Sequence, residues 1–274
     1  MLRTAGPQDL PALREFLASA NDAPYDISVV AEEKCFGPGI DGKPVVRVLE
    51  EGDRIRAVSV VCGRWIRLLA VARDARRQGI GRMLVADAEA MGATLVAAEP
   101  GNYFTPGVPM DDVASRTFCH AVGYIETRWT WNLEVGLEGI VAPTDVVRPT
   151  AADTDRVLHF VEAEFGKIWR FEAARALDRE VPTAFIAEDA GRITGFAVHD
   201  VNNRGLGFFG PTGVAKSMRG HGIGGRLLLA SLADLRRLGY TEAIIPWTDA
   251  IEFYRKCCGA KPAHRFIAFA KPRP

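Results

Sequence analysis

Two short basic segments carry the residue types that bind phosphate groups. Arg76-Arg77-Gln78-Gly79-Ile80-Gly81 and Arg219-Gly220-His221-Gly222-Ile223-Gly224 align without a gap, 143 residues apart. A loop with glycine at the first turn of a helix exposes backbone N–H groups, and the positive end of the helix dipole attracts anions. The two segments therefore predict two loops that cradle a pyrophosphate.

Basic side chains within and just after these loops supply further hydrogen-bond donors for a phosphate-rich ligand. The predicted ligand-binding residues are Arg76, Arg77, Gln78, Gly79, Gly81 and Arg82 in the first copy, and Arg219, Gly220, His221, Gly222, Gly224, Gly225 and Arg226 in the second. An isolated glycine turn often serves only to pack a strand on its helix. Two copies in matching contexts favour a binding function.

A dinucleotide-binding loop is the competing interpretation. Gly220 to Gly225 satisfies the pattern G-x-G-x-x-G between a predicted strand and a predicted helix. The first copy breaks that pattern at Met83-Leu84, and Glu242 is the one nearby acid at about the distance of a ribose-binding carboxylate, roughly 20 residues on. The dehydrogenase hypothesis is therefore disfavoured.

The motif Arg-x-x-Gly-x-Gly, with a valine five residues before the arginine, resembles the acyl-CoA-binding motif of the GNAT superfamily of N-acetyltransferases. The resemblance covers essentially the whole chain, and Phe208-Phe209-Gly210-Pro211-Thr212-Gly213 is similar to segments of a little-characterised bacterial group of tandem GNAT proteins. It implies acetyl-CoA as co-substrate, a primary amine as acceptor, and strands that splay apart before each loop. Backbone N–H groups near Val71 and Val214 would then hold the acyl carbonyl, as an oxyanion hole does.

The resemblance also implies a tyrosine that protonates the departing thiolate of CoA. Tyr254 is the candidate catalytic acid, although it lies five residues before Gly259 and the family pattern has four. In the first copy Cys119 stands four residues before Gly123, and a thiol is a weaker hydrogen-bond donor than a phenol. Catalysis is therefore expected in the second half.

No carboxylate lies in the strands that precede the loops, residues 65–71 and 206–214, so the general base is unassigned. Asp200, His199 and Asp249 could reach the cleft from neighbouring strand ends, but turn formation is the favoured interpretation for each. The rigid turn from Gly101 to Pro109 could line an acceptor pocket. The aromatic residues Phe160, Phe165, Trp169 and Phe171 are interpreted as core packing.

The elements around the motifs repeat as well. Residues 54–58 and 192–196 each follow an acidic, glycine-containing turn and begin a hairpin, and a strand and an amphipathic helix start at Arg3 and again at Arg148. Each loop leads through a helix that ends at Gly92 or Gly239 into a parallel strand. The predicted fold class is α/β with a mixed sheet (α+β), built as two tandem GNAT acyl-CoA N-acyltransferase domains at residues 1–138 and 145–274. The linker is placed within 136–145 because it contains Gly136, Gly139 and Pro143.

Composition limits the remaining possibilities. The chain has 274 residues, of which 48% are hydrophobic and 25% charged, and a net charge of zero disfavours nucleic-acid and membrane partners. Its five cysteines show no C-x-x-C spacing, and no apolar run reaches membrane-spanning length, so a cytoplasmic monomer or homodimer is expected. Neither a metal-binding set nor a G-x-S-x-G nucleophile motif occurs.

These observations predict transfer of an acetyl group from acetyl-CoA to a primary amine of a small molecule or peptide. The alternative is a non-catalytic acyl-CoA-binding or regulatory module in which both copies have lost the chemistry. Acceptor loops vary independently of the scaffold, so the acceptor itself is left open.

Overall fold

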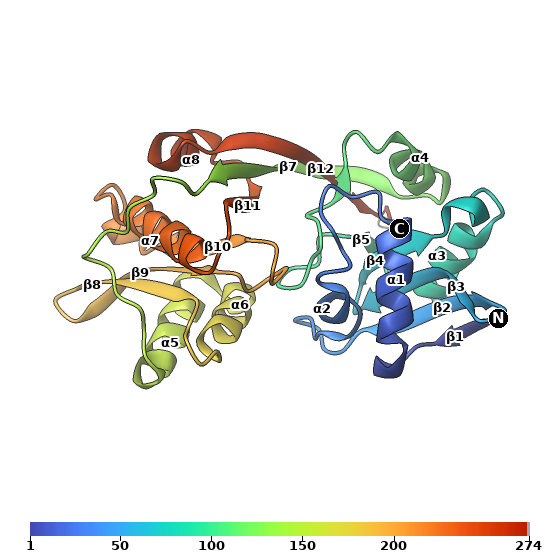
Figure 1. Ribbon diagram of the computed structural model, residues 1–274, viewed down its shortest axis with the longest axis horizontal. Coiled ribbons are helices and arrows are strands. Elements are labelled where there is room, and N and C mark those ends of the chain that lie inside the picture. The colour runs from blue at the N-terminus through green and yellow to red at the C-terminus, as the bar shows by residue number, and fades with distance from the viewer. Residues whose placement is uncertain (273–274) are drawn as a thin grey trace. The chain divides into compact units, whose positions relative to one another are not determined.

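The computed structural model describes residues 1–272, and the chain forms two compact units. The first unit comprises residues 1–130 together with the C-terminal segment that begins at His264, and the second comprises Trp131–Ala263. Figure 1 shows both, with the N-terminal helix α1 against the sheet of the first unit and helix α7 against the strands of the second.

The first unit contains most of the elements before residue 131. They are β1 (Leu2–Thr4), α1 (Leu10–Ala20), α2 (Ala31–Phe36), β2 (Val45–Glu51), β3 (Arg54–Cys62), β4 (Trp65–Val71), α3 (Ile80–Ala90), β5 (Leu95–Val96), β6 (Val108–Pro109), α4 (Val113–Ala121) and the first part of β7 (Ile125–Gly136). Strands β1 to β4 are antiparallel neighbours, whereas β4 pairs with β5 in parallel. Every residue from Ala57 to Cys62 in β3 is buried, so both faces of this sheet are covered.

The second unit repeats this order. After the second part of β7 come α5 (Thr154–Phe165), α6 (Lys167–Leu177), β8 (Ala184–Asp189), β9 (Arg192–His199), β10 (Phe209–Val214), α7 (Ile223–Arg237), β11 (Glu242–Thr248), α8 (Ile251–Cys258) and the first part of β12 (Lys261–Ala270). Strands β8, β9 and β10 form an antiparallel sheet, and β11 pairs antiparallel with β7. The predicted repeat of hairpin, loop, helix and parallel strand is thus present twice, and the predicted fold class is confirmed.

Alternation along β9 explains how its helices are arranged. Phe196 and Val198 pack with α5 and α6, whereas Ala197 between them belongs to the core formed with α7. Because successive side chains of a strand point to opposite faces, α5 and α6 cover one face of β9 and α7 covers the other. Because β10 pairs with β9 in the same sheet, it also has one face toward α7 and the other toward α5 and α6.

The compact units differ from the predicted division into residues 1–138 and 145–274. Trp131 to Gly136 of β7 pair with β11 and lie in the second unit, while the residues of β12 from Phe266 onward pair with β5 and β6 of the first. Each of these long strands is divided between the two units. The glycine at residue 136 correctly predicted the end of β7. A local turn signal does not indicate which strands will pair with β7, and therefore does not indicate to which unit it belongs.

Two buried contacts show how closely β12 fits the first unit. Phe266 and Phe269 are 0% and 1% exposed. A Cβ at Gly107 would lie 2.5 Å from the carbonyl oxygen of Ile267, so the backbone beside β6 approaches β12 where only glycine fits. The first unit therefore takes part of its core from the far end of the chain.

Removing residues 264–274 should destabilise the first unit, even though residues 1–130 are all retained. Loss of the buried Phe266 and Phe269 side chains is expected to cost at least about 3 kcal/mol, the usual effect of deleting one buried phenylalanine. Limited proteolysis followed by mass spectrometry would locate the new cleavage sites. A chain ending at Lys271 is the control, and cleavage confined to residues 131–263 would contradict the prediction.

Candidate functional site

The two glycine loops have the same backbone conformation. Gly79 (φ 85°) and Gly222 (φ 74°) are both left-handed and stand immediately before α3 and α7. Neither helix has a side chain that caps its first turn. The first-turn N–H groups therefore face outward at the positive end of each helix dipole, which is the arrangement that binds phosphate.

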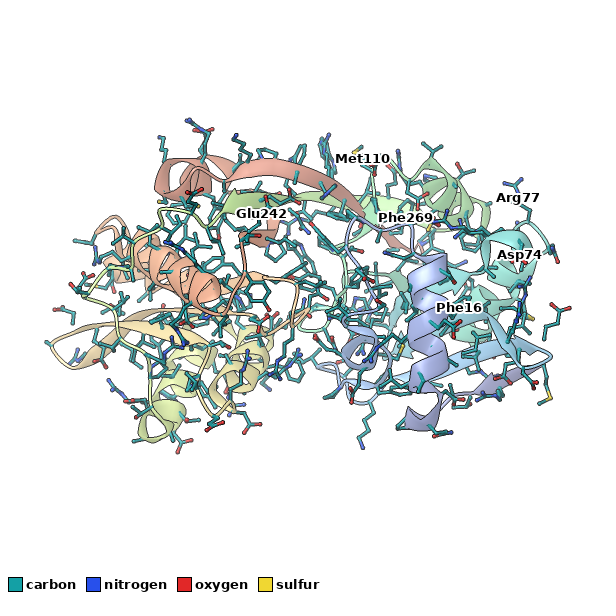
Figure 2. The ribbon with its side chains drawn as sticks, viewed as in Figure 1. Phe16, Asp74, Arg77, Met110, Glu242 and Phe269 are labelled. Carbon is teal, nitrogen blue, oxygen red and sulfur yellow. The ribbon has the colours of Figure 1, made fainter. Side chains whose placement is uncertain are left out.

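Arg77 keeps this conformation without being a glycine. Its φ is 66°, and Gly220 at the matching position of the second copy has φ 87°. A left-handed residue with a side chain costs on the order of 1 kcal/mol, so the surrounding loop imposes the conformation. Arg77 is exposed, and Figure 2 shows it with Asp74 on the turn that leads into α3.

Several of the predicted phosphate-binding side chains hold the loops together. Arg76 Nε donates to Val71 O at 3.1 Å, and Arg219 Nε donates to Val214 O at 3.3 Å. Arg82 donates to Ala121 O, Gln78 to Asp74 O and Arg226 to His221 O, while His221 Nδ1 lies 3.1 Å from Arg219 O. Arg219 uses only its Nε in this contact, so its terminal nitrogens, the exposed N–H groups and the Arg77 side chain are left to meet a ligand.

Each strand before a loop separates from the next parallel strand after a short contact. β4 pairs with β5 only at Trp65–Leu95 and Ile66–Val96. β10 meets β11 through the single bridge Phe208–Ile244. Within the described residues, the last part of β4 and of β10 has no partner on that side, so each unit has an opening that leads to Val71 or Val214.

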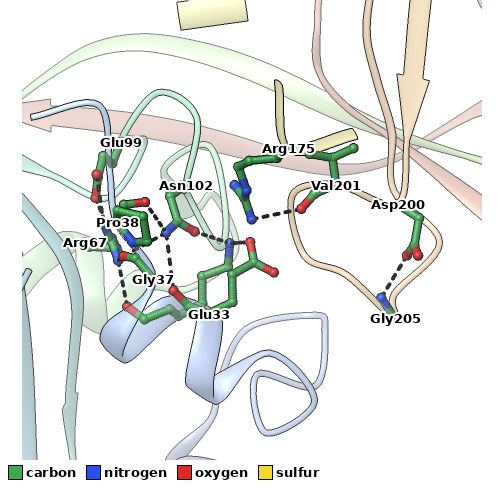
Figure 3. Close-up of polar contacts among 11 residues, drawn as sticks. Glu33, Gly37, Pro38, Arg67, Glu99, Asn102, Arg175, Asp200, Val201 and Gly205 are labelled. Carbon is green, nitrogen blue, oxygen red and sulfur yellow. Dashed lines mark hydrogen bonds and ion pairs between the residues drawn. The ribbon is translucent and has the colours of Figure 1, made fainter. Parts of the chain in front are cut away.

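A buried ion pair occupies the opening of the first unit. In the first unit Arg67 and Glu99 form an ion pair with N–O distances of 2.5 and 2.9 Å, and both side chains are fully buried (Figure 3). Arg67 also donates to the backbone oxygens of Lys34 and Gly37. A Cβ at residue 39 would lie 1.7 Å from Glu99 Oε1, so Gly39 is required for this contact.

A second buried cluster lies beside this ion pair in the first unit. Asn102 donates to the backbone oxygens of Gly37 and Pro38 at 3.2 and 3.0 Å, and Lys34 donates to Asn102 Oδ1 at 2.9 Å (Figure 3). Tyr103 and Phe104 are buried as well. The turn from Gly101 to Pro109, predicted as a possible pocket wall, thus belongs to the packed interior of the first unit.

The second unit lacks this ion pair. The strand contacts Trp65–Leu95 and Phe208–Ile244 match, and counting from them places Gly210 at the position of Arg67 and Thr248 at that of Glu99. The strand irregularity also recurs, since both β4 and β10 shift register against the preceding strand at this point. The geometry is shared, but the second opening holds no buried charge at these two positions.

Tyr254 lies in the core beside this opening. It is 8% exposed and packs edge-to-face on Phe209 of β10, with ring centroids 6.3 Å apart. Burial raises the pKa of its phenol to about 12. The hydroxyl therefore stays protonated throughout the neutral range.

The structure accounts for the unusual spacing of Tyr254. Phe118 lies 3.1 Å from a Cβ built on Gly81, and Phe253 lies 3.4 Å from one built on Gly224, so these two phenylalanines are equivalent. Cys119 and Tyr254 then match, because α8 runs one residue further before Gly259. Burial also raises the pKa of the Cys119 thiol to about 12.

Two of the candidate bases have structural roles. Asp200 accepts hydrogen bonds from Gly205 N (Figure 3) and from the Tyr240 hydroxyl, both at 2.8 Å, which holds the turn after β9. His199 is fully buried with Nε2 2.8 Å from Asp234 Oδ2, and Asp234 also pairs with Arg148 at 2.6 Å. Desolvation lowers the pKa of His199 despite this carboxylate. The turn-forming interpretation of Asp200 fits these contacts.

Two kinds of feature are absent from residues 1–272. Residues 1–272 contain no group of three or more His, Cys, Asp and Glu side chains placed to hold a metal ion. No helix among them has the length and apolar character needed to cross a membrane. All five cysteines are free thiols.

Part of the sequence matches a protein-family model, and the fold matches solved structures. The model of the Acetyltransferase (GNAT) family matches residues 153–260, which include β10, the second glycine loop and Tyr254. None of the curated proteins matches the sequence.

Several solved structures share the fold. A GCN5-related glucosamine N-acetyltransferase region of a fungal multi-domain β-N-acetylglucosaminidase gives a TM-score of 0.80 at 16% identity over 98% of this chain, which spans 38% of the length of that protein. A GCN5-related N-acetyltransferase from Sphaerobacter thermophilus gives 0.71 at 20% identity, covering 100% of this chain and 96% of that one. A tandem GNAT protein from the clavulanic acid biosynthesis pathway gives 0.71 at 17% identity, with coverages of 100% and 99%.

The molecule is thus a tandem GNAT fold, in which the same scaffold occurs twice along one chain. The match to the Acetyltransferase (GNAT) family model covers residues 153–260, which lie within the second unit.

Replacing Glu99 by Gln should strongly destabilise the first unit, because it leaves the buried guanidinium of Arg67 without a counter-charge. Breaking one partner of a buried pair typically costs about 3–5 kcal/mol. Urea denaturation followed by circular dichroism would measure the loss. Glu188→Gln, which removes the part-exposed partner of Arg156, is the matched control and should cost at most about 1 kcal/mol. Equal losses in the two variants would disprove the assignment.

Proposed function

We propose that the protein transfers the acetyl group of acetyl-CoA to a primary amine, and that the transfer takes place in the second unit. The observation that carries this proposal is the opening beside β10, which leads to Val214 and the second glycine loop and holds no ion pair like that of Arg67 and Glu99. The family match over residues 153–260 supports it.

The residues around each loop fit a CoA pyrophosphate. Positive φ at Gly79 and Gly222 turns the first-turn amides outward, and no neighbouring atom lies within 4 Å of a Cβ built on Gly79 or Gly220. In the proposal the ligand is held by Val71, Arg76, Arg77, Gln78, Gly79, Gly81 and Arg82 in the first unit, and by Val214, Arg219, Gly220, His221, Gly222, Gly224 and Gly225 in the second. Arg76, Gln78, Arg82 and His221 also contact backbone oxygens of the protein, so in the proposal they hold the loop in shape as well as line the ligand site.

The chemistry requires a neutral amine and a proton for the leaving thiolate. The amine nitrogen attacks the thioester carbonyl, whose developing negative charge would be stabilised by the Val214 N–H. Collapse of the tetrahedral intermediate breaks the C–S bond, and the Tyr254 hydroxyl delivers a proton to the sulfur. The amine proton leaves through water, since His199 and Asp200 are engaged elsewhere.

The first unit is proposed to bind acyl-CoA without transferring the acyl group. Its loop has the same backbone as the second loop, but Arg67 and Glu99 occupy the inner end of its opening and Cys119 replaces the tyrosine. The alternative, a chain that binds acyl-CoA and performs no chemistry in either unit, predicts no thioester consumption at all.

Calorimetric titration with acetyl-CoA should find two sites in the wild-type protein. Substituting Gly222 and Gly224 by valine should leave one, because a β-branched residue at φ 74° cannot keep the loop conformation. Substituting Gly79 and Gly81 in the same way should also leave one site. Absence of binding to the wild-type protein would contradict the proposal and favour the dinucleotide interpretation.

Tyr254→Phe should lower the turnover number at saturating acceptor by about a hundredfold, the usual contribution of a general acid. Cys119→Ala should leave turnover unchanged. The acid is active when protonated, so its contribution persists below its pKa of about 12, and turnover of the wild type should show no decline between pH 7 and 10. Steady-state assays of released CoA thiol would measure both effects. Unchanged turnover of Tyr254→Phe across this range would exclude the acid role.

The proposal also covers the cellular compartment, the oligomeric state and the first acceptors to test. Five free thiols suit a reducing, cytoplasmic compartment, and the two fused copies suit a monomer or a homodimer. Among the structural relatives, the fungal region is described as a glucosamine N-acetyltransferase, so an aminosugar belongs in the first acceptor screen.

A further inference from the structure

A stacked pair of aromatic rings lies on the α5 and α6 side of β10. Phe165 ends α5 and Trp169 lies in the first turns of α6, with ring centroids 5.0 Å apart and planes 28° from parallel. Phe196 of β9 supports both rings at 5.5 and 6.0 Å. Phe196 is fully buried, whereas Phe165 and Trp169 are only partly buried. The pair therefore rests on the core and keeps some surface open.

Phe165 reaches the backbone of β10 because residue 213 has no side chain. A Cβ built on Gly213 would lie 2.5 Å from Phe165 Cζ and 2.6 Å from its Cε1, closer than any real contact. In the first unit the loop repeat places Ala70 at this position, and counting from the matching turns Pro7–Asp9 and Ala151–Asp153 places Asn21 at that of Phe165. The aromatic contact is a feature of the second unit alone.

The contact between Phe165 and Gly213 lies next to the proposed acyl-binding residue. Gly213 immediately precedes Val214, whose N–H is proposed to hold the thioester carbonyl. The Val214 side chain points to the opposite face, where its Cγ2 lies 3.6 Å from a Cβ built on Gly224 of the cofactor loop. Phe165 thus contacts the strand one residue before Val214, on the face away from α7.

The rim of this aromatic pair is electrically balanced. Glu162 of α5 and Arg170 of α6 form an ion pair at 3.0 Å, and both are more than 40% exposed. Glu164 and Lys167, the other charged residues between them in the sequence, also cancel in charge. The charges between Glu162 and Arg170 thus cancel, so this segment provides no net field to attract a polycation.

We propose that Phe165 and Trp169 form the acceptor subsite of the second unit and select amines that carry a flat apolar face. An aryl ring and the C–H face of a pyranose ring both supply such a face, and a flexible aliphatic chain does not. This inference rests on the proposed acetyl transfer. Stacking on a pre-formed ring pair orients the amine with little loss of side-chain entropy.

Acceptor selectivity tests the subsite. The probes are an arylethylamine, glucosamine and a linear aliphatic diamine, each assayed at saturating acetyl-CoA. Trp169→Ala should raise KM at least tenfold for one or both of the flat-faced amines and leave that of the diamine unchanged, with the Kd of acetyl-CoA unaltered. If the KM of the arylethylamine rises, the subsite binds an aryl ring; if that of glucosamine rises, it binds the C–H face of a sugar. Phe171→Ala, on the same helix, is the matched control and should change none of these constants.

A double-substitution cycle tests the contact with β10. Gly213→Ala introduces the methyl group that the first unit carries at Ala70, which must displace the Phe165 ring. It should raise KM for the responsive amine as Trp169→Ala does. In a Phe165→Ala background the added methyl has room, so Gly213→Ala should cause no further change.

Three results would overturn the inference. Equal losses for all three amines would show that the rings act only in packing. A shift in preference from acetyl-CoA to propionyl- or butyryl-CoA, with unchanged acceptor KM, would place the rings at the acyl group. Calorimetric binding of the amines to the CoA complex needs no turnover, and equal affinity for all three would refute the subsite even if transfer fails. The acetyl-CoA titration separately decides the proposed function.

Discussion

Everything at the candidate site depends on the early separation of two parallel strands, β4 from β5 and β10 from β11. Beyond Ile66 in the first unit and Phe208 in the second, the strand before the loop loses its neighbour on that side. Buried backbone groups without partners cost about as much free energy as a lost hydrogen bond. Each unit must therefore satisfy this opening, either with its own side chains or with a ligand.

The two units reach different solutions from the same backbone. Arg67 occupies the first opening, its charge is neutralised by Glu99, and its remaining donors are taken by the backbone oxygens of Lys34 and Gly37. Gly210 and Thr248 stand at those positions in the second unit, so no ion pair forms between them at the inner end of the second opening.

The local features of this architecture were predictable from the sequence, and the long-range ones were not. The ungapped repeat from Arg76 to Gly81 predicted the paired loops, since left-handed glycines before a helix have a clear local signature. The exchange of β7 and β12 between the units was missed because pairing partners leave no local signal. The role of Arg67 was missed because a lone arginine in an apolar strand gives no hint of Glu99, 32 residues away. Phe165 and Trp169 were interpreted as core, and only the contact with Gly213 suggests a further role.

Charge distinguishes the two loops where backbone geometry does not. Asp22 forms ion pairs with Arg73 at 2.9 Å and with Arg76 at 2.6 Å, so a carboxylate already offsets the positive charge beside the first loop. Lys216 and Arg219 hold the matching positions of the second loop, are exposed, and pair with no acid among the described residues. The second loop has its own carboxylate, since Asp145 pairs with Arg226 at 2.7 Å, and Arg77 and Arg82 of the first loop pair with no acid among the described residues. A duplicated scaffold can thus keep one binding geometry while the ion pairs around it form at different positions.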